Sequence, residues 1–418
     1  MRIRPTASLG WKNAWEGNPI IKTTPFHARV EAANQTGLWS HWAGYLVVDK
    51  YQMSEKFEYF AIRNSAGVFD TSPLYKYRIR GKDSERFLAG VLARNIRKCR
   101  PGQAQYTLWC DDRGFVVEDG VVLRQRVDEF LLTSAQPNLA YFENLVGYES
   151  VEIEDVTDQL GALAFQGPRS RAILETLAPE IGALGYFHVT EAKIGNAPAT
   201  ISRTGFTGDL GYEIWVDASD AVATWDRLME ASEGHGVLPF GQTALLMARI
   251  EAGLLLLKAD FESSRYAWND DHRSTPIELG FGWMFRDLET ENRPFVGRRA
   301  ISQELSSGAS RWKLVGLIVD WKEYDAKYNS AGLVPPKDHT PITEEYMLYT
   351  DDHSRVGYAT SLMYSPILQR HIAIARVIPE LSASGTRVNL EVTINHRYEL
   401  VGAHVARLPL FNPPRKTS

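Results

Sequence analysis

Residues 203–216 read RTGFTGDLGYEIWV, in which a turn with a glycine at every third position leads into a strand-like run. The GxxGxxG spacing differs from the GxGxxG of phosphate-binding loops, and the run after it has the period of a strand and not of a helix. Alternation places Glu213 and Trp215 on one face, opposite Tyr212 and Ile214. A lone carboxylate beside an indole either lies on the solvent side of a hairpin or faces a ligand.

A second acidic feature lies within residues 105–122, where an Asp-Asp-Arg-Gly turn joins two strand-like runs. Glu118 and Asp119 interrupt the second run, which is otherwise apolar. They fall on opposite faces of the strand, so one of them should point inward and need a hydrogen-bonding partner. This pattern alone fits a functional carboxylate and a structural one equally.

The chain has 418 residues and a net charge of −5. This length exceeds one hydrophobic core, so we expect two or three domains. The acidic balance gives no general attraction for nucleic acid or for an anionic membrane. The sequence shows neither the apolar run of a signal peptide nor a stretch that could span a bilayer, so we expect a cytoplasmic enzyme that acts on small molecules.

Cysteine and histidine usage argues against a disulfide framework and against a metal site. The only cysteines are Cys99 and Cys110, a number that fits a reducing compartment. The ten histidines are scattered singly, without the HxH, HExxH or CxxC spacing of metal sites. We therefore predict no metal.

The first 300 residues repeat one order of elements. A strand near residues 77–81 leads into an amphipathic helix, and a strand near 163–168 leads into another. We predict an α+β protein with an N-terminal extension over residues 1–25 and a domain over 26–300. That domain would consist of two related α+β subdomains, divided at about 26–160 and 161–300.

The composition changes after this domain. Residues 301–311 are small and polar, which predicts a linker. Beyond it, runs of alternating residues separated by turns predict a C-terminal antiparallel β-barrel or sandwich over residues 312–410. The expected strands lie near residues 314–319, 355–360, 372–377, 388–394 and 399–405.

Six ordered segments of the chain resemble the folate-dependent aminomethyltransferase family, which includes the glycine-cleavage T-protein and its demethylase relatives. The resemblance runs from about Thr24 to about Pro413. It implies two α+β subdomains that form a folate site, together with a C-terminal antiparallel β-barrel domain. The six segments are residues 61–70, 114–122, 165–168, 204–213, 249–253 and 275–280.

The resemblance implies tetrahydrofolate as cofactor and methyl acceptor. It places Asp119 near the reactive N5 as the catalytic residue and makes Glu213 the anchor of the pterin ring. One carboxylate can accept hydrogen bonds from both the 2-amino group and the adjacent ring N–H. Ordinary packing is the alternative role for Tyr106. The cofactor-binding residues implied by the resemblance are Glu213, Tyr106, Phe206, Ser134 and Arg249.

The chain also departs from the glycine-cleavage enzyme. Leu245 stands where that enzyme has an arginine associated with folate binding, so we expect the folate tail to be held differently. Residues 261–273 form a longer segment than the equivalent loop of the T-protein. Residues 24–32 are more similar to the start of dimethylsulfoniopropionate demethylases, which favours demethylation.

Aromatic residues are concentrated shortly after this N-terminal segment. Such a group could surround a methylated cation through cation–π attraction, or it could belong to the core. The candidate substrate-pocket residues are Trp39, His41, Trp42, Tyr45 and Tyr51.

The resemblance and these departures together predict transfer of a methyl group from a small N-, S- or O-methylated substrate to N5 of tetrahydrofolate. One alternative is an aminomethyltransferase that acts on a lipoyl carrier protein as its partner. The other is a folate-binding module without catalysis. We expect no nucleic-acid partner and no membrane partner, and the sequence identifies neither the methyl donor nor the oligomeric state.

Overall fold

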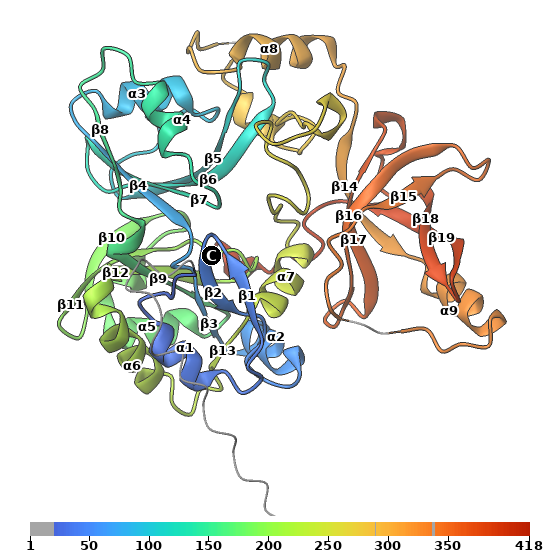
Figure 1. Cartoon of the computed structure of the whole chain (residues 1–418), viewed down its shortest axis with the longest axis horizontal. Coiled ribbons are helices and arrows are strands. Elements are labelled where there is room, and N and C mark those ends of the chain that lie inside the picture. Colours follow the sequence, from blue (N-terminus) through green and yellow to red (C-terminus); the bar gives the residue numbers. More distant parts are fainter. Residues whose placement is uncertain (1–20, 289, 337–338) are drawn as a thin grey trace, which may run out of the picture.

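The computed structural model describes residues 21–288, 290–336 and 339–418. The chain forms three lobes, two with mixed helices and sheet and one barrel (Figure 1). Most of the predicted N-terminal extension, residues 1–20, lies outside the described residues.

The first lobe is built on a six-stranded sheet with the strand order β10-β11-β12-β9-β3-β13. Tyr212 and Ile214 on β12 are fully buried in the core beneath helices α1, α5 and α6, whereas Glu213 lies on the opposite face and is half-buried. The alternation predicted for this strand is confirmed. The strands are β3 (Gly67–Asp70), β9 (Leu160–Gln166), β10 (Val189–Ile194), β11 (Ala197–Ser202), β12 (Gly211–Asp217) and β13 (Leu238–Pro239); the helices are α1 (His27–Ala33), α5 (Ser170–Leu177) and α6 (Ala221–Ala231).

The second lobe contains a five-stranded sheet with the order β5-β6-β7-β4-β8. Helices α3 and α4 lie on the same side of this sheet (Figure 1), and their apolar residues share one core with Tyr77 and Trp109. The strands are β4 (Tyr75–Arg80), β5 (Gln103–Cys110), β6 (Val116–Arg124), β7 (Glu129–Ser134) and β8 (Glu152–Asp155); the helices are α3 (Ser84–Val91) and α4 (Leu139–Asn144).

The predicted division of the two halves near residue 160 does not separate the two sheets. β3 precedes the second lobe in sequence, yet it pairs with β9 and β13 in the sheet of the first lobe. All four residues of β3 are buried, so the strand has no alternating pattern that indicates its partner. The hairpin of β1 (Trp39–Trp42) and β2 (Tyr45–Val48) and helix α2 (Glu55–Asn64) also precede the second lobe.

The third lobe is a closed antiparallel barrel, which confirms the predicted C-terminal barrel. Its strand order is β14-β17-β16-β15-β18-β19, and β19 closes the sheet by pairing with β14. Sequence patterning missed the short strand β15 and helix α9 (Trp321–Ser330). The strands are β14 (Lys313–Val319), β15 (Tyr346–Tyr349), β16 (Arg355–Ser365), β17 (Arg370–Val377), β18 (Arg387–Ile394) and β19 (Arg397–Ala406).

Most of residues 301–311, which the sequence predicts as a linker, belong to helix α8 (Arg298–Ser307). Ile301 is 1% exposed and packs against the turn at Gly114, which anchors the helix to the second lobe. Gly308 ends the helix in a left-handed conformation with φ of 65°. Polar residues on the other faces of the helix gave the segment its linker-like composition.

A buried ion cluster connects the glycine turn to α2 and to helix α7 (Gln242–Glu251), which lies beside the barrel (Figure 1). The guanidinium of Arg63 lies 2.6 Å from a Glu251 carboxylate oxygen and 3.5 Å from one of Asp209, and all three side chains are fully buried. Glu251 also accepts a hydrogen bond from Ser365 of the barrel at 2.6 Å. The cluster therefore joins the turn, two helices and the barrel.

Replacing Arg63 with Met should lower the free energy of unfolding by about 3–5 kcal/mol, because the buried carboxylate of Glu251 loses its cation. Asp209 keeps Arg415 at 2.7 Å. The matched control is Arg29→Met, whose ion pair with Asp226 has side chains 41% and 48% exposed. That control should cost less than about 1 kcal/mol. Urea midpoints measure both changes, and similar shifts for the two variants would contradict the role assigned to the cluster.

None of the helices within the described residues combines the length and the apolar character that crossing a bilayer requires.

Candidate active site

A cavity of about 740 Å³ lies where the first lobe meets loops of the second lobe and the segment after α7. Most of its lining is apolar or aromatic, which suits a flat organic ligand. It is lined by His41, Trp42, Ala43, Gly44, Phe69, Tyr75, Ala135, Gln136, Pro137, Phe206, Gln242, Leu245, Leu246, Leu256, Leu257, Lys258, Glu262 and Tyr266.

The glycine turn brings Phe206 to this cavity, and the side chain of Gln166 explains two of its three glycines. Gln166 donates hydrogen bonds from Nε2 to the carbonyls of Thr204, at 3.2 Å, and Tyr212, at 3.0 Å. A Cβ at Gly205 or Gly211 would lie 1.9 or 2.3 Å from the Gln166 amide oxygen. Packing around Gln166 thus requires the first and third glycines of the turn, whereas Gly208 has a φ of +71° and packs closely against Ala252.

Glu213 follows the turn on β12, between Ser202 on β11 and Ala164 on β9. The hydroxyl of Thr204 donates a hydrogen bond to its Oε2, whereas Oε1 accepts none from the described residues. Burial raises the pKa of the Glu213 carboxyl, and the bond from Thr204 opposes that shift. Glu213 itself is not among the side chains that line the cavity.

Asp119 on β6 is paired with Tyr106 on the neighbouring strand β5. The Tyr106 hydroxyl donates to Oδ2 of Asp119 at 2.8 Å, and both side chains are half-buried. Burial raises the pKa of Asp119 to about 6, against the lowering effect of the Tyr106 bond. The Tyr106 ring packs on Phe281 with 5.4 Å between centroids. The structure therefore brings these two predicted residues together, although neither lines the cavity.

Glu118, the neighbour of Asp119, is the inward-pointing member of the acidic pair. It is fully buried and accepts hydrogen bonds from the backbone N–H groups of Ala135, at 2.5 Å, and Gln136, at 2.9 Å. Asn138 donates to its other oxygen at 2.6 Å. Burial raises the pKa of Glu118 to about 8, and these hydrogen bonds oppose the shift. Glu118 thus fixes a wall of the cavity to the strand that carries Asp119.

Two other predicted cofactor-binding residues lie outside the cavity. Ser134 is buried and donates to the carbonyl of Gln136 at 2.7 Å, so it supports the cavity wall from behind. Arg249 is fully buried, forms an ion pair with Asp260 and donates to Ser361 of the barrel at 2.8 Å. The charge of Arg249 thus joins α7 to β16, and a contact of Arg249 with the cofactor stays a prediction.

Of the five predicted substrate-pocket residues, the structure brings only His41 and Trp42 to the cavity. Tyr51 belongs to the core of the first lobe, and the buried Tyr45 donates its hydroxyl to Asp158. Trp39 packs on the ring of His27 with 5.3 Å between centroids. The cavity is reached only by the tip of the β1–β2 hairpin, so residues farther along its strands cannot contribute.

Sequence reasoning missed several cavity residues. Phe69 and Tyr75 flank the start of the second lobe, and Gln242 begins α7. Lys258 follows α7 as a single charge after a run of leucines, a pattern that gives no functional signal by itself. The longer segment over residues 261–273 was the one sequence feature that could have indicated these cavity residues, because Glu262 and Tyr266 from that segment line the cavity.

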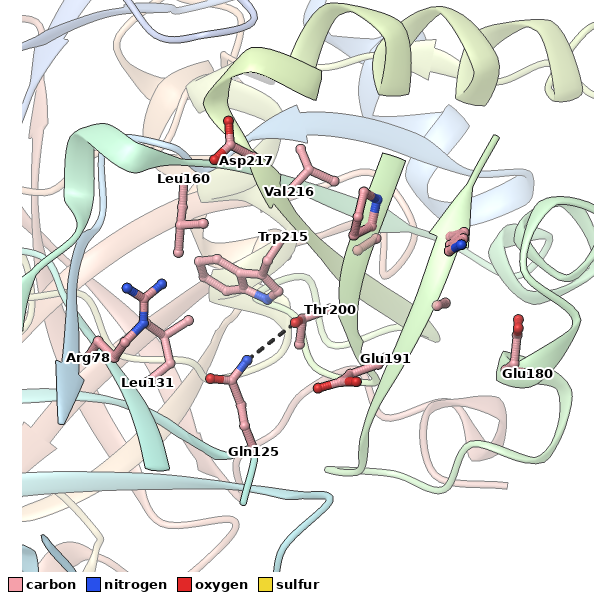
Figure 2. A pocket seen from close by; sticks show the side chains of 14 residues that line it. Arg78, Gln125, Leu131, Leu160, Glu180, Glu191, Thr200, Trp215, Val216 and Asp217 are labelled. Atoms are coloured by element: carbon pink, nitrogen blue, oxygen red, sulfur yellow. Dashed lines mark hydrogen bonds between the residues drawn. The ribbon is translucent and has the colours of Figure 1, made fainter. Parts of the chain in front are cut away.

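A second cavity of about 620 Å³ lies against the other end of the face of β12 that carries Glu213. Figure 2 shows Trp215 in its wall, beside Thr200 and Gln125, whose amide donates to the Thr200 hydroxyl at 3.3 Å. None of the predicted catalytic, cofactor-binding or substrate-pocket residues lines this cavity. The first cavity is therefore the candidate active site.

The described residues contain no group of three or more His, Cys, Asp or Glu side chains placed to hold a metal ion. Both cysteines are buried as free thiols, and burial raises their pKa.

Comparison with known proteins links both parts of the fold to one family. Residues 26–286 match the family model described as the GCVT N-terminal domain, and residues 329–412 match the glycine cleavage T-protein C-terminal barrel domain. An aminomethyltransferase of Bacillus subtilis (strain 168) is 32% identical over 365 residues, which cover 86% of this chain and 91% of that protein.

Two further relatives extend this comparison. A trimethylamine-oxide aldolase of Ruegeria pomeroyi is 31% identical over 358 residues, 82% of this chain and 41% of that longer protein. The crystal structure of the glycine cleavage system aminomethyltransferase T from Bartonella henselae superposes with a TM-score of 0.77. It covers 94% of this chain and 98% of its own, at 23% identity, and therefore supports the fold.

Proposed function

Because the chain belongs to the glycine-cleavage T-protein family of folate-dependent aminomethyltransferases, we propose that it is a tetrahydrofolate-dependent demethylase. The family is one of folate-dependent transferases, so the chain is an enzyme and tetrahydrofolate is its cofactor. In the proposed reaction, a methyl group passes from a small N-, S- or O-methylated substrate to N5 of tetrahydrofolate.

The observation that carries the choice of a methylated substrate is the position of Trp42 at the hairpin tip. Its ring faces Phe69, 6.3 Å away between centroids, in a cavity that also contains Phe206. Aromatic faces attract methylated cations, whereas a neutral methoxy group gains apolar contact. The relative named trimethylamine-oxide aldolase also takes its name from an N-methylated compound, which supports the same substrate class.

The described residues fit tetrahydrofolate as a ligand. The cavity volume lies within the range of organic ligand pockets, and Phe206 offers a ring for stacking. Glu213 has one carboxylate oxygen without a protein donor, and the other is held by Thr204. Glu213 would hold the pterin edge, Phe206 its ring and Asp119 the region of N5.

Bound tetrahydrofolate supplies N5 as the atom that accepts the methyl group. Asp119 would take up the proton that N5 loses, while the donor heteroatom leaves with the electron pair of its bond to the methyl carbon, so charge and atoms balance. Tyr106 would orient the carboxylate. Holding the two reactants in line can contribute roughly 7–11 kcal/mol to lowering the barrier.

The pH profile should report the ionisation of Asp119. Its pKa is raised to about 6, so the carboxylate is ionised mainly above that pH, and kcat/KM should fall as the pH drops through 6. In Tyr106→Phe the carboxylate loses a stabilising hydrogen bond, so the acid limb should move upward by about one pH unit. Steady-state rates between pH 4.5 and 9 measure the acid limb of the wild type and of Tyr106→Phe. An acid limb at the same pH in both enzymes would contradict this assignment.

The test of the proposal is formation of 5-methyl-tetrahydrofolate by the purified protein without any carrier protein. Quaternary ammonium, sulfonium and methoxy compounds serve as donors under anaerobic conditions, and chromatography measures the product. Methyl transfer from at least one class supports the proposal. The proposal fails if product forms only with a lipoylated carrier protein.

That second outcome defines the alternative function, aminomethyl transfer from a lipoyl carrier protein. It is favoured by the relatives named aminomethyltransferase. It would yield methylene-tetrahydrofolate and ammonia, and release of ammonia distinguishes it from demethylation. The membership in a family of transferases argues against a folate-binding module without catalysis.

A further inference from the structure

Lys258 is the one lysine or arginine among the residues that line the candidate active site in the described parts of the chain. Its ammonium group makes no hydrogen bond or ion pair with any described residue. The acidic residue of the same wall, Glu262, accepts a hydrogen bond from the backbone of Ser263 at 2.8 Å. Lys258 is exposed at the mouth of a mostly apolar cavity, and no carboxylate of the described residues lies within ion-pair distance of its ammonium group.

The backbone at Lys258 is in a conformation that lysine rarely adopts. Its φ is +71°, in the left-handed region, where a residue with a Cβ is disfavoured. The Lys258 N–H donates to the carbonyl of Phe261 at 2.8 Å, which closes a tight turn. Such a conformation persists only where the surroundings enforce it, and it is concentrated at functional sites.

Asp260 enforces this turn. Its Oδ2 accepts the N–H of Leu256 at 2.8 Å and pairs with Arg249. Its Oδ1 accepts the hydroxyls of Thr360, at 2.6 Å, and Ser361, at 2.7 Å, on β16. These bonds fix the loop to strand β16 of the barrel. Lys258 lies on this loop at the cavity.

We propose that Lys258 binds a carboxylate of the molecule that fills this cavity. This inference rests on the proposed function, and it identifies Lys258 as the residue of the same site that binds an anion. A single ammonium group without a helix N-terminus beside it carries one positive charge, which matches the one negative charge of a carboxylate better than the higher charge of a phosphate. Leu245 contributes only apolar surface to the same cavity, which leaves the charge recognition to Lys258.

The carboxylate has two chemical sources, the glutamate tail of the folate or the methyl donor. The test compares Lys258→Met with wild type by anaerobic calorimetry, using tetrahydrofolate and tetrahydropteroate, which lacks the glutamate. If the tail is the ligand, Lys258→Met should bind tetrahydrofolate about 10- to 100-fold more weakly and bind tetrahydropteroate as wild type does.

If the donor supplies the carboxylate, both folates should bind Lys258→Met normally. The KM should then rise by a similar factor for donors with a carboxylate and stay unchanged for donors without one. Lys193→Met, from the second cavity, is the matched control and should behave as wild type in every assay. Lys258→Arg should retain most of the binding because it keeps the charge.

A stability readout separates this role from a structural one. Lys258→Gly removes the strained Cβ, so it should melt at a higher temperature than Lys258→Met while showing the same loss of binding. The inference is overturned if Lys258→Met has wild-type affinity for both folates and wild-type KM for carboxylate donors. If wild type binds neither folate, the proposed function is overturned and this inference with it.

Discussion

Replacing Asp119 with Asn should lower kcat by about 10²- to 10⁴-fold, the range that general base catalysis contributes, and leave tetrahydrofolate affinity within about threefold of wild type. Asparagine keeps the size of the side chain, and its oxygen can still accept the Tyr106 hydroxyl. It cannot take up a proton at physiological pH. Single-turnover rates measure the chemical step, and calorimetry measures the affinity.

The matched control for this prediction is Asp112→Asn, an exposed acid at the turn before β6. It should leave both the rate and the affinity unchanged. The account of Asp119 is wrong if Asp119→Asn retains the wild-type single-turnover rate. A loss of affinity at an unchanged rate would instead make Asp119 a binding residue.

Replacing Glu213 with Ala should weaken tetrahydrofolate binding by about 100-fold or more, because two charge-assisted hydrogen bonds of about 1.5–3 kcal/mol each are lost. The fold should tolerate the change, because Glu213 is half-buried and its protein partner Thr204 keeps a hydrogen bond with Ser202 at 2.6 Å. Calorimetric titration gives the affinity, and thermal unfolding shows whether the variant is folded.

Two further variants, one conservative and one a control, test the role of Glu213. Glu213→Gln keeps the size but carries only one acceptor oxygen, so its affinity should fall between those of wild type and Glu213→Ala. Glu191→Ala, an exposed acid on β10 of the same sheet, should bind as wild type does. Wild-type affinity in Glu213→Ala would contradict the assignment of Glu213 as the residue that anchors the pterin ring.

The barrel and the main strand of the first lobe were predictable from the sequence because their patterns are local. Val315, Leu317 and Val319 alternate into the barrel core, as a strand with one buried face requires. Strand β15 escaped prediction because it has only four residues, of which Leu348 alone is fully buried. A run that short gives no reliable period.

Tertiary pairing was not predictable in the same way. Strand β3 is buried along its whole length, so its sequence fits either sheet, and its position depends on partners about 100 and 170 residues away. Which of the N-terminal aromatic residues reach the cavity was not predictable for a similar reason. The turn at Ala43 and Gly44 sets the hairpin tip, where Trp42 reaches the cavity, whereas Tyr51 lies beyond the hairpin in the core of the first lobe.

The candidate site was predictable to the extent that it depends on motifs. The structure joins Asp119 to Tyr106, places Phe206 in the cavity and leaves Glu213 with an available oxygen. Lys258 was not predictable, because its unusual backbone is imposed by Asp260 through Thr360 and Ser361, which lie about 100 residues later. No local pattern encodes a turn that is fixed by the barrel.

We propose that this cavity binds tetrahydrofolate, and anaerobic calorimetric titration of the purified protein with tetrahydrofolate measures that binding. The expected result is saturable binding of one folate per chain, lost in Glu213→Ala. The absence of binding to the folded wild-type protein would contradict it, because the roles proposed for Asp119 and Glu213 both require the cofactor in this site.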